Sequence, residues 1–251
     1  MIALGRCGNC AIACAMITSG APGGKAHAMP LGEQMRIAGL LLALIGRFLF
    51  RQKRDRLEFL TKVAYQATQK RLKGKTTQSF LRALIAGEDR RFFDHAGIDP
   101  IGITSAFWRF LRFGQLSGAS TIEQQLVRIL TGDKQRTFGR KIREMIMACL
   151  ISKKYKKGEI AWMYMATAYY GWRMNGIEEA CDRLGIKMPD VTPRQAASII
   201  ARLKYPEPCF PNDRRILQIE RRTQHLLALM AVTDQNSKPE EVVPDAAVLD
   251  V

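Results

Sequence analysis

The sequence predicts a mainly α-helical protein, and three observations lead to this prediction. Apolar residues recur every three or four positions in several segments, which places them on one face of a helix. Residues that typically cap helices stand before such segments, at Ser120, Thr137 and Thr192. No segment alternates apolar and polar residues strongly enough to predict a β-sheet, and no internal repeat is present.

Composition indicates one large domain, or a domain with tails, that meets an anionic partner. The 251 residues are 47% hydrophobic, which is ample for a core. Lysine and arginine total 39 against 23 acidic residues, a net charge of +16. Such an excess favours binding to nucleic acid, a phospholipid surface or a phosphorylated substrate.

The first fifty residues suggest a membrane attachment. Residues 1–30, rich in Ala, Gly and Cys, are predicted to be an N-terminal extension that is either signal-like or mis-started, with Met29 as the true start. Residues 37–50 are the most hydrophobic stretch, and as a helix they would span about 21 Å. The hydrocarbon core of a bilayer is about 30 Å thick. We therefore predict that residues 31–52 form a marginal membrane anchor or an interfacial helix, with a helix buried on the main domain as the alternative.

Two further segments combine positive charge with features typical of membrane contact. Residues 47–75 contain ten basic residues and two acids, which favours a position against anionic lipid over a merely solvated helix face. Residues 103–118 interleave arginines with too many large apolar side chains for one core. An interfacial membrane contact explains both, and stacking on nucleic acid is the rival interpretation. The residues concerned are Phe107, Trp108, Arg109, Phe110, Leu111, Arg112 and Phe113.

A candidate catalytic carboxylate follows the helix predicted from Phe80. Leu81, Leu84 and Ile85 share one face of that helix, and Glu88 continues it. Charged side chains are seldom buried without a partner, and a desolvated carboxylate is a better proton acceptor near neutral pH. The alternative is that the helix ends at Gly87 and that Glu88 reaches water.

Two capped helices are predicted next. Ser120 and Glu123 form a capping box, which gives Glu123 a structural role. Thr137 caps a helix over residues 138–155. Its predicted apolar face consists of Phe138, Ile142, Met145, Ile146 and Cys149. Arg140 and Glu144 lie opposite that face, either as a surface ion pair or as the wall of a cleft.

Towards the C-terminus we predict three more helices and a tail. The first covers about residues 158–170 and ends at Gly171. The second is capped by Thr192, with Pro193 at its first position and Gln195 completing a capping box. The third covers about residues 212–232, and residues 233–251 form an acidic, disordered tail.

Five short motifs in this order resemble the signatures of the family 51 peptidoglycan glycosyltransferases. They extend from about Leu81 to Met230. The first resembles E-D-x-x-F-x-x-H-x-G-x-D, the second G-x-S-T-x-x-Q-Q and the third R-K-x-x-E. As they stand here, the five are GEDRRFFDHAGID, GASTIEQQL, RKIRE, KKGEIAWMYMATAYYG and RQAASIIARLKYPEP.

The resemblance implies a mainly α, lysozyme-like glycosyltransferase domain over residues 53–232, with a small membrane-associated jaw lobe and the N-terminal hydrophobic anchor. It implies a monofunctional enzyme that polymerises lipid II into glycan strands with inversion and releases undecaprenyl pyrophosphate. The enzyme would sit at the bacterial cytoplasmic membrane, with its catalytic domain facing the periplasm or the cell exterior. Its partners would be lipid II, the nascent glycan strand and other cell-wall synthesis proteins, and not nucleic acid.

The resemblance also implies roles for individual residues. Glu88 matches the base that deprotonates the acceptor hydroxyl, and Glu144 matches a second carboxylate on the donor side. Arg128, Arg140 and Lys141 match basic positions near the pyrophosphate, where a divalent cation, Mg²⁺ or Mn²⁺, is common in the family. The other matching substrate-binding positions are Asp89, His95, Ser120, Thr121, Gln124 and Gln125. From the residues themselves no metal site is predicted, because Cys7, Cys10 and Cys14 lack a fourth ligand.

The sequence departs from the family pattern at several positions. Ala166 stands where Asn is expected, Ala119 and Glu123 interrupt the second signature, and Arg128 replaces the usual Lys. Because Glu88 and Glu144 are kept, we still predict a working enzyme. The alternatives are a lysozyme-like peptidoglycan hydrolase, a basic nucleic-acid-binding protein and a degenerate, non-catalytic scaffold.

Overall fold

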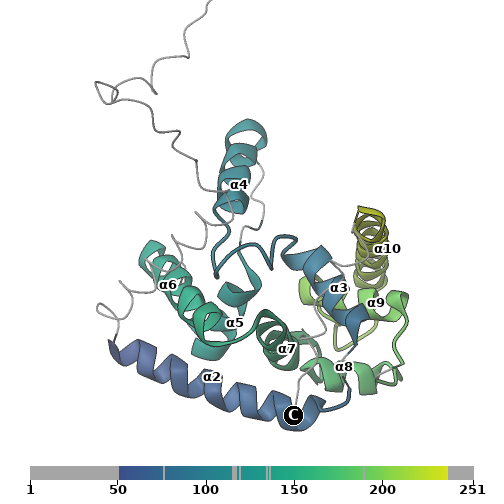
Figure 1. The fold of residues 1–251 in the computed structure, drawn as a ribbon. Coiled ribbons are helices and arrows are strands. Elements are labelled where there is room, and N and C mark those ends of the chain that lie inside the picture. Colours follow the sequence, from purple (N-terminus) through teal and green to yellow (C-terminus); the bar gives the residue numbers. More distant parts are fainter. Residues whose placement is uncertain are drawn as a thin grey trace, which may run out of the picture. The chain divides into compact units, whose positions relative to one another are not determined.

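The computed structural model describes residues 51–75, 77–114, 118, 120–133, 135, 137–188 and 190–236 (Figure 1). The predicted N-terminal extension and all of the predicted anchor except its last two residues therefore lie outside the described residues. Within the described ranges, no helix has both the length and the apolar character that crossing a bilayer requires.

The prediction of a mainly helical protein is confirmed. In chain order the helices are α2 (Arg51–Leu72), α3 (Gln78–Glu88), α4 (Pro100–Phe113), α5 (Ile122–Thr131), α6 (Phe138–Lys154), α7 (Lys157–Thr167), α8 (Ile177–Arg183), α9 (Pro193–Lys204) and α10 (Asp213–Asn236). One antiparallel hairpin, β1 (Tyr169–Gly171) with β2 (Met174–Asn175), lies between α7 and α8. Strands this short leave no alternation for sequence patterns to detect.

Helix α7 lies in the middle of the helices and forms the centre of the core (Figure 1). It is apolar on nearly all sides, which is typical of a helix surrounded by others. It packs against α2, α3, α5, α6 and α8. The ring of Phe80 on α3 meets Trp162 of α7 edge to face, with centroids 6.4 Å apart. Through these contacts α7 fixes the positions of α3 and α5, which carry the candidate site.

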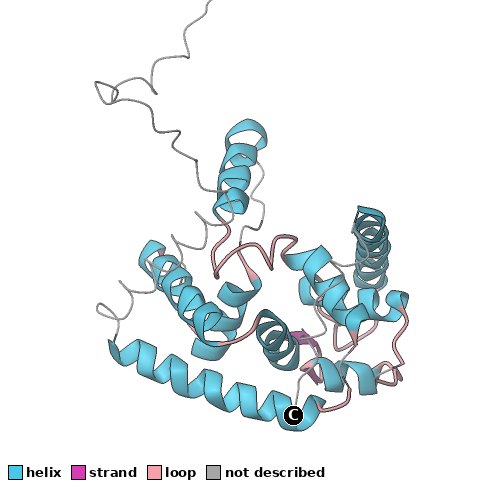
Figure 2. Cartoon of the chain, in the orientation of Figure 1, coloured by secondary structure: helices cyan, strands magenta, loops and turns pink. Residues whose placement is uncertain are grey.

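Helix α4 stands clear of this core (Figure 2). Asp99 caps it by accepting a hydrogen bond from the Gly102 N–H at 2.9 Å, and none of its residues is buried. Trp108 is 62% exposed and Phe113 63% exposed. The expectation that the aromatic side chains do not share one core is therefore confirmed, whereas their contact with a membrane stays a prediction.

The predicted start of α5 is wrong by one residue. Thr121, not Ser120, caps this helix, and its hydroxyl oxygen accepts a hydrogen bond from the Gln124 N–H. The capping box does not form, because Glu123 turns into the protein and pairs with Lys157 instead of folding back on the helix start.

The predicted apolar face of α6 is also wrong in part. Phe138 is 82% exposed and Ile142 39% exposed, whereas Glu144, Met147 and Ile151 are buried. The face that carries Glu144 turns inward because cations from neighbouring positions compensate its charge.

The boundaries near the C-terminus differ from the predicted ones. Helix α7 ends at Thr167, because the chain then enters the β-hairpin. The cap at Thr192 is confirmed, with both hydrogen bonds of its capping box. Helix α10 continues to Asn236, four residues into the predicted tail, and the rest of that tail lies outside the described residues.

Candidate functional site

Glu88 ends α3 beside a cavity. Leu81 and Leu84 of its predicted apolar stripe are fully buried, while the side chain of Glu88 itself is 17% exposed. The amide nitrogen of Gln125 on α5 donates a hydrogen bond to Glu88 Oε2 at 3.1 Å. Of the two interpretations that the sequence left open, the structure favours the partly buried carboxylate over one that simply reaches water, and the amide fixes one of its two oxygens.

The orientation of Gln125 is itself fixed by Tyr164 of α7. The tyrosine hydroxyl donates to Gln125 Oε1 at 2.8 Å, which turns the amide NH₂ towards Glu88. Burial, followed by the nearby Glu88 carboxylate, raises the pKa of Tyr164, so its hydroxyl remains a donor. Tyr164 begins the signature in which Ala166 replaces Asn, and Ala166 packs against the core. The polar link from this signature to Glu88 therefore persists without the Asn.

Tyr164→Phe should slow the reaction without weakening substrate binding. The substitution removes the donor that fixes the Gln125 amide, so Glu88 loses a preorganised partner. We expect turnover to fall about tenfold, with a stability loss of roughly 1 kcal/mol. Turnover and KM on lipid II, the substrate that the resemblance implies, together with a thermal melt, check this. Tyr169→Phe, at a side chain that is 52% exposed, is the matched control. An effect on KM alone would contradict the positioning role.

Arg222 of α10 is a site residue that sequence reasoning missed. Its Nη2 donates to the carbonyl oxygen of Gly87 at 2.7 Å and lies 3.9 Å from Glu88 Oε1. It belongs to none of the five signatures, and α10 carries several other arginines. Nothing in the sequence pattern indicates which of them turns towards Glu88.

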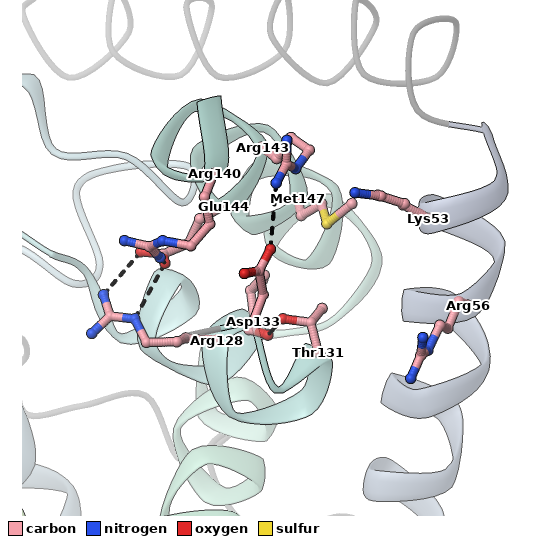
Figure 3. A pocket seen from close by; sticks show the side chains of 10 residues that line it. Lys53, Arg56, Arg128, Thr131, Asp133, Arg140, Arg143, Glu144 and Met147 are labelled. Carbon is pink, nitrogen blue, oxygen red and sulfur yellow. Dashed lines mark hydrogen bonds and ion pairs between the residues drawn. The ribbon is translucent and has the colours of Figure 1, made fainter. Parts of the chain in front are cut away.

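Glu144 of α6 lies in a cluster of three cations, of which Figure 3 shows Arg128 and Arg140. Arg128 grips both carboxylate oxygens, at 3.2 Å from Nε and 3.0 Å from Nη2. Arg140 donates to Oε2, and Lys141 donates to Oε1 at 2.9 Å. The structure thus brings together the three cations that the resemblance places near a pyrophosphate and the carboxylate that it places on the donor side. It favours the cleft-wall interpretation over the surface ion pair.

Lys141 connects this cluster to α5. Its ammonium group donates to Ser120 Oγ at 2.8 Å and to Gln124 Oε1 at 2.6 Å, besides Glu144. Burial lowers the pKa of Lys141, although the contact with Glu144 acts in the opposite direction. Two predicted substrate-binding residues, Ser120 and Gln124, are therefore held by a predicted pyrophosphate-binding lysine.

The stabilising effect of Glu144 should disappear in acid. Burial raises its pKa, but the hydrogen bonds from Arg128 and Lys141 outweigh burial and leave the pKa below the ordinary value of 4.5. A carboxylate with a lowered pKa stabilises the folded state above its unfolded pKa, and this contribution is lost as the pH falls through the folded pKa. The gap in melting temperature between wild type and Glu144→Gln should therefore narrow from about pH 7 to about pH 3. A gap that stays constant would contradict this linkage.

The two carboxylates line two cavities. Glu88 lines one of about 320 Å³ together with Ser120, Thr121 and Arg222. Glu144 lines another, of about 230 Å³, and the two share no lining residue. Ser120 reaches both carboxylate regions, since it lines the first cavity and accepts the hydrogen bond from Lys141. The connection between the two halves of the site therefore runs through Ser120 and Lys141.

The remaining predicted site residues hold the loop around Gly97. His95 hydrogen-bonds Asp89 at 3.0 Å, and the Thr121 hydroxyl donates to the Gly97 carbonyl at 2.8 Å, as does the Gln124 amide at 3.4 Å. Gly97 has a φ of +91°, and a Cβ there would lie 2.6 Å from the Ala148 backbone, so the position requires glycine. Asp89 and Thr121 also line the Glu88 cavity, whereas His95 and Gln124 are almost fully buried. Substrate contact by these four residues stays a prediction.

Glu123 has a structural role, though not the predicted one. Its side chain is fully buried and accepts a hydrogen bond from Lys157 Nζ at 2.5 Å. The same ammonium lies 4.5 Å from the centroid of the Phe92 ring. The departure from the second signature is thus accommodated by an ion pair between α5 and α7.

Two carboxylates, Glu144 and Asp133, line the cavity beside these cations, and each accepts a hydrogen bond from an arginine, so neither is a free ligand for the predicted divalent cation. Glu144 is the acid of that cluster, and both of its oxygens are already hydrogen-bonded to cationic side chains. Within the described ranges, one group has ligand atoms close enough for a metal, all within 4.8 Å: Asp89, His95 and Glu123. That group is buried and paired internally or with Lys157. Use of Mg²⁺ or Mn²⁺ stays a prediction, and no step is derived through it.

Several known proteins are similar in sequence to this chain. A family profile described as Transglycosylase matches residues 58–231. Penicillin-binding protein 1A of Vibrio cholerae is 36% identical over 148 residues, which are 58% of this chain and 18% of that protein. Penicillin-binding protein 1A of Escherichia coli is 37% identical over 141 residues, 54% of this chain and 17% of that protein. A monofunctional glycosyltransferase of Staphylococcus epidermidis is 32% identical over 139 residues, 52% of each chain.

Proposed function

The chain belongs to the transglycosylase family, and we propose that it polymerises lipid II into glycan strands and releases undecaprenyl pyrophosphate. The alignments span about half of the monofunctional relative and under a fifth of the penicillin-binding proteins, so the activity rests on the site. The observation that carries the proposal is the half-buried Glu88 held by Gln125 beside a cavity.

In the proposed reaction Glu88 acts as the general base. Gln125 occupies Oε2, and Oε1 stays available to take the proton from the 4-hydroxyl of the acceptor N-acetylglucosamine. The hydroxyl oxygen then attacks C1 of the donor N-acetylmuramic acid from the face opposite the diphosphate, which inverts the configuration at C1. Arg222 holds the end of α3 through the Gly87 carbonyl and so keeps the base in place.

The cation cluster would stabilise the leaving diphosphate. Arg128, Arg140 and Lys141 are preorganised around Glu144 before any substrate binds. Their charge exceeds that of the single carboxylate, and a guanidinium can grip phosphate oxygens with two hydrogen bonds. Glu144 thus positions the cations, while the excess charge faces the developing negative charge on the bridging oxygen.

We also propose a fold family and a location at the membrane for the protein. The helical domain is proposed to have the lysozyme-like fold, with α4 as the membrane-dipping lobe, and residues 31–52 as an anchor in the bacterial cytoplasmic membrane. Exposed Trp108 and Phe113 on α4 support this assignment, because aromatic side chains favour the membrane interface. The catalytic domain would then face the periplasm or the exterior, where the growing glycan strand and other cell-wall synthesis proteins are its partners.

Purified full-length protein with labelled lipid II tests the proposal, with and without a divalent metal. Strand growth and release of undecaprenyl pyrophosphate are expected. If the protein instead cleaved polymeric peptidoglycan and left lipid II untouched, it would be a lysozyme-like hydrolase. Loss of strand growth on metal removal, restored by Mg²⁺ or Mn²⁺, would support the predicted cation.

A further inference from the structure

The cavity lined by Glu144 extends beyond the cation cluster to the start of α2. Its volume is about 230 Å³, and Lys53 and Arg56 of α2 line it. In Figure 3 the Lys53 side chain extends from α2 towards Met147, whereas the Arg56 side chain lies along α2. Five cationic and two acidic side chains line it. The full lining is Lys53, Arg56, Val127, Arg128, Thr131, Asp133, Arg140, Arg143, Glu144 and Met147.

The positive charge of this cavity is not balanced from within. Glu144 is engaged by Arg128 and Arg140. Asp133 meets Arg143 only at 3.4 Å, a long contact for an ion pair with a hydrogen bond. The side chains of Lys53 and Arg56 form neither a hydrogen bond nor an ion pair with any residue in the described part of the chain. Two exposed cations of α2 thus line the cavity without an ion-pair partner among the described residues.

We propose that Lys53, Arg56 and Arg143 form a second anion site that binds a phosphoryl group. Three cations that line one cavity, two of them guanidinium groups with fork-like donors, suit the tetrahedral oxygens of a phosphate monoester or diester. At these three residues the positive charge favours an anion over a metal cation. Because its contact with Asp133 is long, Arg143 can leave that carboxylate and form a shorter ion pair with the phosphoryl group.

The sequence around α2 indicates a phospholipid headgroup as the source of this phosphoryl group. Lys53 follows the apolar segment of residues 37–50 almost at once, and residues 47–75 are strongly basic. Cations directly after an apolar membrane segment lie at the depth of anionic headgroups. The cavity would then bind one lipid headgroup and hold the helical domain at the surface of the bilayer. Free inorganic phosphate offers the same chemistry, so the test includes it.

The test titrates full-length protein in neutral detergent with short-chain phosphatidylglycerol, short-chain phosphatidylcholine and inorganic phosphate. We expect saturable binding of phosphatidylglycerol that Lys53→Gln/Arg56→Gln weakens about tenfold or more. The matched control is Lys187→Gln/Arg214→Gln, which removes the same charge at two exposed positions outside the cavity. It should change the affinity less than about twofold.

The possible outcomes distinguish binding at the proposed phosphoryl site from nonspecific electrostatic attraction to a basic protein. Equal weakening by both double variants, or no saturable binding of phosphatidylglycerol or inorganic phosphate, would overturn the proposal. Inorganic phosphate that binds as tightly as the lipid, with the same dependence on Lys53 and Arg56, would support the phosphoryl site and identify free phosphate as its source. The probes contain neither sugar nor diphosphate, so the result is independent of whether the protein polymerises lipid II.

Discussion

Glu88→Gln should abolish strand synthesis while leaving the protein folded. The amide keeps the shape of the side chain but cannot accept the proton of the acceptor hydroxyl, so the rate should fall by about 10²–10⁴-fold. The Glu88 side chain is partly exposed at the end of α3, and an amide can still meet Gln125 after a flip, so the melting temperature should change little. Polymerisation of labelled lipid II and a thermal melt measure the two quantities.

Glu220→Gln on α10 is a suitable control, because it removes a carboxylate from a surface ion pair with Arg194. It should leave polymerisation unchanged, since surface pairs contribute little to stability. Glu88→Gln protein that still bound lipid II but no longer extended strands would have lost the chemical step alone. Normal strand synthesis by Glu88→Gln would remove this residue from the role of base.

Lys157→Met should cause the largest loss of stability among single substitutions at the described ion pairs. Glu123 is fully buried, and its Oε2 already lacks a hydrogen-bond partner among the described residues, so Lys157 supplies the compensation for its charge. Removing one partner of a buried pair leaves an uncompensated charge and costs about 3–5 kcal/mol. Denaturant unfolding should show a lower midpoint with an unchanged slope.

The double variant Glu123→Leu/Lys157→Met should recover most of that loss, because replacing both members of a buried pair by apolar side chains is often close to neutral. Lys153→Met, at an exposed position of α6, should stay within about 0.5 kcal/mol of wild type. If Lys157→Met were as mild as Lys153→Met, the buried pair would not be the stabilising contact described here.

The sequence predicted the elements of this protein better than the faces that those elements bury. Caps at Thr137 and Thr192 were predictable because each depends on a few adjacent residues. The apolar face of α6 was not, because its outcome depends on partners far along the chain. Arg128 from α5 makes it favourable to bury Glu144, and so Phe138, an apolar residue at the helix start, is left outside.

In the candidate site, too, residues within sequence motifs were predictable, whereas a residue placed by distant packing was not. The family-like motifs pointed to Glu88, Gln125 and the cations around Glu144, which the structure brings into hydrogen-bonded groups. Arg222 could not be predicted, since its role depends on the packing of α10 against α3. The hydrophobic pattern of α10 reports which side faces the core, and it carries no information about which arginine reaches the end of a different helix.

Helix α5 carries three of these links on ten residues: Glu123 to Lys157, Gln125 to Glu88, and Arg128 to Glu144. Each residue added or removed within the helix would rotate everything beyond it by about 100°. Insertions and deletions here would therefore break several links together. Length variation during evolution has to be absorbed in the loops on either side of the helix.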